Sequence, residues 1–270
     1  MSLSLRSPAL IRRRRMKVAR RVIFWLFLIL LIIAMPLWLS YADFLRIKEI
    51  EVIGANTLLA SDIKSLAEER LAGKYFFLFP KNNAVLYSKE DIKSSLSKEF
   101  TQIDTVELNL NSLNMLEISV EMRKPSALWC RNLDTKLCYF IDNKGLVFEE
   151  AGDFSPGVYF IYYGNIEDEV IGALYLSSEE FKNVEAFKAG VRNLSLIPQS
   201  ISPLSKGSFK LSVSGGDIIF SLRDDITATL SNLASVLADS KLKVVDNQEL
   251  TVSSIDLRFG NKVILKKGTE

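Results

Sequence analysis

Cys130 and Cys138 are the residues whose type and spacing most directly suggest covalent chemistry in this chain. Seven residues lie between them. Two strand ends joined by such a loop can bring facing Cβ atoms to the separation that a disulfide needs. We predict a disulfide that links the two strands of a hairpin. Two free buried thiols are the alternative, because cysteine also packs as a small hydrophobic residue. A zinc or redox site would require a CxxC pair or further ligands.

Histidine is absent from the sequence, which removes the commonest general base and the usual zinc ligand. Ser-His-Asp, Cys-His and HExxH sites are therefore excluded. A Ser-Lys dyad stays chemically possible, but the Ser-x-Met-x-Pro nucleophile element is missing. Paired carboxylates also stay open, because 32 acidic residues produce accidental pairs, although most acids are solvated surface charges. We predict no catalytic residue, metal site, cofactor or small-molecule substrate.

The element that positions the rest of the chain is an apolar stretch over residues 22–42. No ionisable side chain occurs between Val22 and Leu39. About 20 helical residues cover the ~30 Å hydrocarbon core of a bilayer, so we predict a transmembrane helix. A cleaved signal peptide is the alternative, because Ser40-Tyr41-Ala42 ends in small residues. The apolar run is longer than the roughly 7 to 15 residues of a signal peptide's apolar region, which favours a retained anchor.

The preceding residues 1–21 carry eight cations and no acid. Because Lys and Arg beside a span stay in the cytoplasm, we predict a cytoplasmic tail, expected to be unstructured, and an extracytoplasmic remainder. The topology determinants are Arg12, Arg13, Arg14, Arg15, Lys17, Arg20 and Arg21. For this cluster, contact with anionic lipids is favoured over nucleic-acid binding, because the cations lie beside a span. Without the eight tail cations the chain has 26 basic and 32 acidic residues, which argues against nucleic-acid binding by the remainder.

Beyond the apolar stretch, hydrophobic spacing predicts the order strand, helix, helix, strand, strand over residues 45–123. Alternation is cleanest over 116–122, and Ser61 and Ser88 are the predicted N-caps of the two helices. Short strands and turns then dominate. Two further helices are predicted there, one after a capping box of Ser177 and Glu180 and one capped by Asp224 or Asp225.

A hairpin is predicted around the glycines of the second half. With Gly215-Gly216 as a two-residue turn, Val213 faces Ile218, Leu211 faces Phe220 and Phe209 faces Leu222, all on one face. The chain then closes with a strand over 255–259, a Gly260-Asn261 turn and a last short strand.

The order of these elements resembles the bacterial cell-division proteins FtsQ and DivIB, in which a single span precedes a POTRA domain and a β-domain. The resemblance is carried by IKEIEVIG, a Gly-aromatic-aromatic turn between the helices, and LEISVEMRKPSA. It continues through Arg123-x-Pro125-x-Ala127 and CYFIDNKGLVF. Ile255, Asp256, Leu257, Arg258 and Phe259 match the terminal motif of that family.

The resemblance implies an α+β fold with five parts. These are a basic tail (1–21), a transmembrane helix (22–42), a POTRA domain (45–123), a mostly antiparallel β-domain with one or two packed helices (124–267) and a short tail (268–270). It implies a non-enzymatic scaffold of the divisome in the bacterial inner (plasma) membrane, enriched at the septum and supporting septal cell-wall synthesis. The implied partners are FtsB-like or DivIC-like and FtsL-like coiled-coil division proteins.

Partner binding is expected at the last strand, because a terminal strand leaves N–H and C=O groups unpaired for another strand. Val263 and Leu265 are the expected side-chain contributors, with ordinary core packing as the alternative. A POTRA-type chaperone or adaptor for envelope polypeptides is the alternative function, and a membrane-anchored Ser-Lys hydrolase is a remote one. The expected docking edge is Lys262, Val263, Ile264, Leu265, Lys266 and Lys267.

Overall fold

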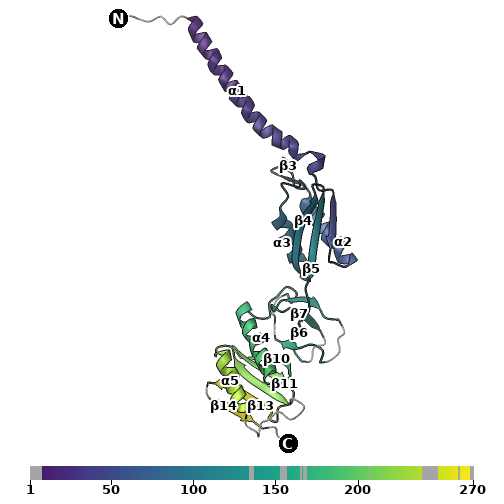
Figure 1. Cartoon of the computed structure of the whole chain (residues 1–270), viewed down its shortest axis with the longest axis vertical. Helices are drawn as coiled ribbons and strands as arrows, with labels where there is room; N and C mark the ends of the chain where they lie inside the picture. The colour runs from purple at the N-terminus through teal and green to yellow at the C-terminus, as the bar shows by residue number, and fades with distance from the viewer. Residues whose placement is uncertain are drawn as a thin grey trace, which may run out of the picture. The chain divides into compact units, whose positions relative to one another are not determined.

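The computed structural model describes residues 8–133, 137–152, 157–164, 166, 169–205, 207–238, 249–260 and 262–267. The fold is mixed α+β, with an N-terminal apolar helix and a large, mostly antiparallel β-sheet (Figure 1). The chain divides into two compact units, unit 1 (Met1–Met122) and unit 2 (Arg123–Glu270).

The first helix, α1 (Pro8–Ser40), is longer than the predicted span. Its Met16–Ser40 portion is long and apolar enough to cross a membrane, and the most apolar part of it contains no buried residue. A helix of this kind suggests a single membrane span, and a signal sequence has the same properties. The prediction of an unstructured tail is wrong for residues 8–21, which continue the same helix because Arg, Lys and Ala are strong helix formers.

Unit 1 continues with a small three-stranded sheet and two helices. In the sheet order β1-β5-β4, β5 is parallel to β1 and antiparallel to β4. A separate two-stranded hairpin, β2-β3, lies between the helices in the chain. The elements are η1 (Asp43–Leu45), β1 (Glu49–Ile53), α2 (Thr57–Leu71), β2 (Lys74–Tyr75), β3 (Phe79–Pro80), α3 (Lys89–Glu99), β4 (Ile103–Ser112) and β5 (Met115–Met122).

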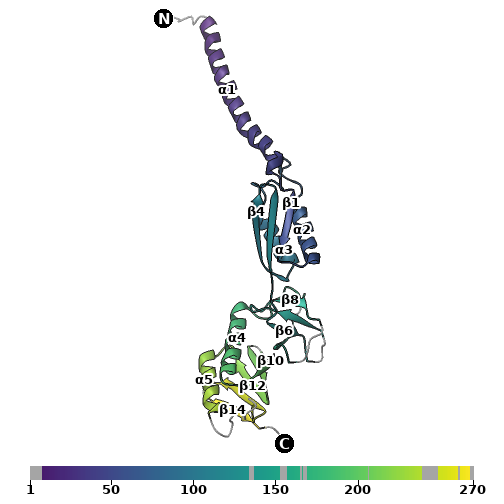
Figure 2. The same ribbon diagram turned by 45° about the vertical axis from the view of Figure 1, so that its right-hand side comes forward.

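The core of unit 1 forms where α2 and α3 cover one face of this sheet (Figure 2). Alternate residues of β5 point into it, as their spacing predicts. Ser88 caps α3 as predicted, since its hydroxyl accepts from the Asp91 N–H at 3.2 Å. The cap predicted at Ser61 is wrong. The N-cap of α2 lies five residues earlier, at Asn56, whose side chain accepts from the Leu59 N–H at 2.9 Å, and asparagine is among the best N-caps.

The turn between β2 and β3 has an unusual backbone. The Leu78 N–H donates to the Tyr75 carbonyl at 3.0 Å, and the two central residues, Phe76 and Phe77, have φ of 49° and 62°. Such turns normally use glycine, asparagine or aspartate at both positions. For other residues the left-handed conformation costs about 1–2 kcal/mol each.

Unit 2 is built on a nine-stranded mixed sheet in the order β14-β13-β12-β11-β10-β9-β6-β7-β8. Five of its eight pairings are antiparallel and three are parallel. The elements are β6 (Ala127–Cys130), β7 (Cys138–Ile141), β8 (Val147–Glu150), β9 (Ile161–Tyr163), α4 (Ser178–Asn193), β10 (Pro198–Ser205), β11 (Ser208–Val213), β12 (Gly216–Ser221), α5 (Ile226–Leu237), β13 (Ser254–Phe259) and β14 (Lys262–Lys266).

Two helices pack against this sheet, and both predicted caps are confirmed. Ser177 and Glu180 form a capping box at α4, and the Asp225 carboxylate accepts from the Ala228 N–H at 2.7 Å at α5. The core between α4 and the sheet includes Phe187 stacked on Phe220 of β12, with ring centroids 3.8 Å apart.

The β11-β12 hairpin differs from its predicted register. The turn is Ser214-Gly215, so that Leu211 pairs with Ile218 and Phe209 with Phe220. Gly216 belongs to the strand, where any Cβ would lie 2.4 Å from the Val252 carbonyl oxygen. Moving the turn by one residue shifts the pairing by two, and strand side chains alternate with period two. The predicted buried face is therefore kept although the partners are wrong.

Candidate partner-binding edge

Strand β14 ends the described part of the sheet. Among the strands that the structure describes, β14 pairs with β13 alone, antiparallel, with Leu265 opposite Ile255 and Ile264 opposite Asp256. The other side of an edge strand carries backbone N–H and C=O groups that can pair with another strand. Lys267 follows the last paired residue, and Asn261 of the predicted turn lies outside the described residues.

The apolar side chains of β14 differ in how far they are exposed. Val263 is half-buried against the core of unit 2, which agrees with core packing for that residue. Leu265 remains 41% exposed, and Ile264, which was not expected to contribute a side chain, is 51% exposed. Because neighbouring strand residues point to opposite faces, β14 offers an apolar side chain on each face beside its unpaired backbone.

Lysines flank these apolar residues. Lys262, Lys266 and Lys267 are exposed, and the hydroxyl of Ser253 donates to the Lys266 carbonyl at 2.8 Å. Lysine on an edge strand discourages pairing between identical edges, because like charges would meet. The edge is therefore suited to a partner strand that carries acidic and apolar side chains.

Strand β13 supports β14 through the motif residues 255–259. Ile255 and Leu257 are buried, whereas Asp256 and Arg258 point to the other face and form a two-pronged ion pair with distances of 2.6 Å and 2.9 Å. The Arg258 hydrogen bonds lower the pKa of the Asp256 carboxyl. An irregularity in the ladder lies between Asp256 and Phe259, and it leaves the Phe259 side chain exposed.

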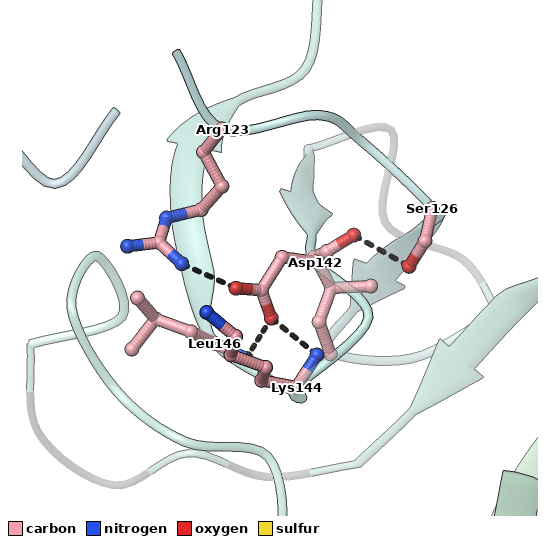
Figure 3. A network of polar contacts seen from close by, with 6 residues as sticks. Arg123, Ser126, Asp142, Lys144 and Leu146 are labelled. Carbon is pink, nitrogen blue, oxygen red and sulfur yellow. Dashed lines mark hydrogen bonds and ion pairs between the residues drawn. The ribbon is translucent and has the colours of Figure 1, made fainter. Parts of the chain in front are cut away.

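A second polar cluster lies at the start of unit 2 (Figure 3). Asp142 is buried, and its Oδ1 accepts from the backbone N–H groups of Lys144 and Leu146, each at 2.8 Å. Its Oδ2 pairs with the Arg123 guanidinium. The Ser126 hydroxyl donates to the neighbouring Ile141 carbonyl at 3.0 Å. The fold thus brings together the turn at Asp142 to Gly145 and the segment from Arg123 to Ala127, which are separate motifs in the sequence.

Cys130 and Cys138 form a disulfide. They lie directly opposite each other in the antiparallel β6-β7 pair, with Cα atoms 4.5 Å apart, and both are buried. The residues 134–136 of the intervening loop lie outside the described part of the chain. The described portion contains no other cysteine.

No protein-family model matches this chain, and no curated protein sequence matches it. Within the described residues, no group of three or more His, Cys, Asp or Glu side chains is arranged to hold a metal ion. The predicted topology residues Arg12 to Arg15 lie in α1, but their side chains are outside what the structure describes.

The sequence patterns did not predict a buried polar cluster formed by Tyr162, Glu185 and Lys188. The Tyr162 hydroxyl donates to Glu185, and Lys188 donates to both of them, to the Tyr162 oxygen at 3.0 Å. Burial and the nearby Glu185 carboxylate raise the pKa of Tyr162, and burial lowers the pKa of Lys188. Tyr162 lies on β9 and the other two on α4, so the cluster joins helix to sheet. More than twenty residues separate the strand from the helix residues, and no local pattern indicates their contact.

Proposed function

We propose that this chain is a non-enzymatic scaffold of the bacterial divisome, of the FtsQ/DivIB type, that recruits coiled-coil division proteins. The basic tail and α1 hold it in the plasma membrane with the bulk of the chain outside. This orientation is supported by the eight cations before the apolar stretch. The absence of histidine from the sequence supports a role without general-base catalysis.

We further propose that residues 45–123 are a POTRA domain. Support comes from the order β1-α2-α3-β4-β5 with the sheet order β1-β5-β4, which resembles that of POTRA domains. In this proposal the domain directs the protein to the division site, while unit 2 docks the partners.

The observation that carries the proposal is the β14 edge. Strand addition by a partner requires unpaired backbone and side-chain contacts, and β14 offers an open backbone edge with one exposed apolar side chain on each face. Its lysines disfavour pairing with an identical edge and favour an acidic partner strand. In such binding, main-chain hydrogen bonds supply affinity and the side chains supply specificity. The proposed partners are FtsB-like or DivIC-like and FtsL-like proteins.

The test is pull-down of these partners from the same bacterium with two edge variants. Val263→Pro removes a backbone donor from β14. Leu265→Glu replaces an exposed apolar side chain of the strand with a carboxylate. We expect each to weaken binding at least about tenfold, which corresponds to about 1.4 kcal/mol. Ile171→Glu is the matched control, because Ile171 is exposed to a similar extent, 44%, and lies outside β14.

Folded variants, verified by circular dichroism, that bind as tightly as the unchanged chain would refute the edge assignment. Deletion of residues 124–267 separates the scaffold from the chaperone alternative. A division scaffold should lose mid-cell partners and produce filamentous cells, whereas a chaperone for envelope polypeptides should lose export. A mature protein that ends up freely soluble after cleavage at Ala42 would contradict the membrane-anchored scaffold.

A further inference from the structure

The β2-β3 turn is attached to the end of the apolar helix. The Tyr41 hydroxyl, one residue beyond α1, donates to the Leu78 carbonyl at 2.7 Å. The Asn83 side-chain amide, which is buried, donates to the Ser40 carbonyl at 2.9 Å. These bonds join the hairpin and the loop after it to the last turn of α1, and Figure 1 shows β3 beside that helix end.

Among the described large apolar side chains of unit 1 outside α1, the two at the tip of this turn are the most exposed. Phe76 is 86% exposed and Phe77 is 94% exposed, and Leu78 beside them is also exposed. Phe44 in η1 and Val85 in the loop after β3 add two more exposed apolar side chains near the same helix end. The segments are held together by hydrogen bonds from the Ile47 N–H to the Asn82 carbonyl and from the Ala84 N–H to the Leu45 carbonyl.

The strain of the turn adds an independent observation. Two consecutive phenylalanines occupy a left-handed conformation that glycine or asparagine adopts with less strain. Because both rings are nearly fully exposed, unit 1 itself gains little from them. A strained conformation that presents two large apolar rings to the surroundings suggests that the stabilising contact lies outside the folded unit.

Three cations lie against the aromatic rings at the helix end and at the base of the hairpin. The Lys74 ammonium lies 5.2 Å and the Arg46 guanidinium 5.8 Å from the centre of the Tyr41 ring, and the Lys81 ammonium lies 5.6 Å from the Tyr75 ring. Aromatic side chains with adjacent Lys and Arg are typical of the headgroup region of a bilayer, where the cations meet lipid phosphates.

We infer that the β2-β3 turn inserts Phe76 and Phe77 into the membrane leaflet at which α1 ends, with the lipid surface as the bound partner. The cations Arg46, Lys74 and Lys81 then contact anionic headgroups. The turn acts as a second, shallow anchor that limits the rotation of the sheet and helices of unit 1 about the end of α1. This inference depends on the proposed retention of α1 as a membrane span.

The test uses the full chain reconstituted into vesicles of equal parts phosphatidylcholine and phosphatidylglycerol. Because Cys130 and Cys138 are joined, a single added cysteine supplies the only free thiol for an environment-sensitive fluorophore. The labelled variants are Phe76→Cys and Phe77→Cys at the turn, Ile29→Cys within α1 and Glu99→Cys at the far end of α3. Glu99 is the matched control, because it is exposed in the same unit and lies at the C-terminal end of an 11-residue helix.

Lipids that carry a nitroxide near the top of the acyl chain serve as quenchers. We expect the labels at positions 76 and 77 to lose at least about half of their fluorescence, as expected for groups that lie roughly 5–10 Å into the headgroup and acyl boundary. The label at position 99 should keep nearly all of its signal, and the label at position 29 should be quenched more strongly by a nitroxide deep in the acyl chain.

The outcomes separate this inference from the proposed span. Quenching at either turn position above that at position 99 supports insertion. Quenching at position 29 with turn labels that behave like position 99 overturns the inference and leaves the span intact. No quenching at position 29 refutes the span and the inference together.

Discussion

Arg123, the first residue of unit 2, forms an ion pair with the buried Asp142. The side chains of both are largely covered, at 11% and 3% exposed. The same carboxylate holds the tight turn after β7 through two backbone N–H groups. One acid thus fixes both the strand-turn-strand element and the point at which the chain enters the unit.

Replacing Asp142 with Ala should strongly destabilise unit 2. The change removes the acceptor that the buried guanidinium shares with two backbone donors, and breaking a buried pair costs about 3–5 kcal/mol. The free energy of unfolding is measured by urea titration, followed by the fluorescence of Trp129 in a chain whose Trp25 and Trp38 are replaced by Phe. Asp142→Asn is the control, because it keeps an acceptor oxygen for the turn and should lose less. Equal losses in both variants would contradict the proposed role of the turn hydrogen bonds.

Removal of the disulfide should lower the stability of unit 2 to a smaller extent. Closing a short loop with a disulfide contributes about 2–4 kcal/mol, chiefly by restricting the unfolded chain. We expect a Cys130→Ser and Cys138→Ser double variant to shift the urea midpoint down by a corresponding amount. Peptide mapping without reductant should recover one crosslinked peptide from the unchanged protein, whereas complete alkylation of both thiols would show that they are free.

The Asp256 and Arg258 pair predicts a loss of stability in acid. Because hydrogen bonds from Arg258 hold the pKa of Asp256 below its ordinary value of 3.8, the unfolded chain takes up the proton first. The contribution is complete at pH above 3.8 and is lost as the pH falls through 3.8 toward the lower pKa of the folded state. Asp256→Asn should therefore weaken the dependence of the urea midpoint on pH in this acid range. Arg258→Gln should have the same effect, and an unchanged acid profile in both would count against this pair.

Because the β2-β3 turn is strained, we predict that a double change will stabilise a fragment that lacks α1. Phe76→Asn with Phe77→Gly supplies the residues that such turns prefer. In a fragment that starts at Asp43 and is measured without lipid, we expect the free energy of unfolding to rise by about 1–2 kcal/mol or more. The reverse sign would show that the phenylalanine rings stabilise the folded unit itself. A Phe44→Ser variant controls for the removal of an exposed apolar ring from outside the turn.

Local patterns in the sequence were sufficient for the elements whose signals lie within a few residues. The capping box of Ser177 and Glu180, the cap at Asp225 and the alternation over 116–122 all describe contacts between near neighbours in the chain. The predicted N-cap of α2 was wrong because two candidate caps lie close together in the sequence. Asn56 and Ser61 are both good caps, and the packing of α2 on the sheet selected the earlier one.

The amino-acid sequence by itself determined the apolar helix, the absence of histidine chemistry and the alternating strands, because each depends on composition or on spacing of two to four residues. The tertiary structure decided the β11-β12 register, where the backbone at Val252 comes too close to Gly216 for any side chain. It also decided that Ile264 and Leu265 remain exposed on a strand with one neighbour, and that the tip of the β2-β3 turn is tied to the end of α1. These features arise from contacts between distant parts of the chain, whose partners no local periodicity specifies.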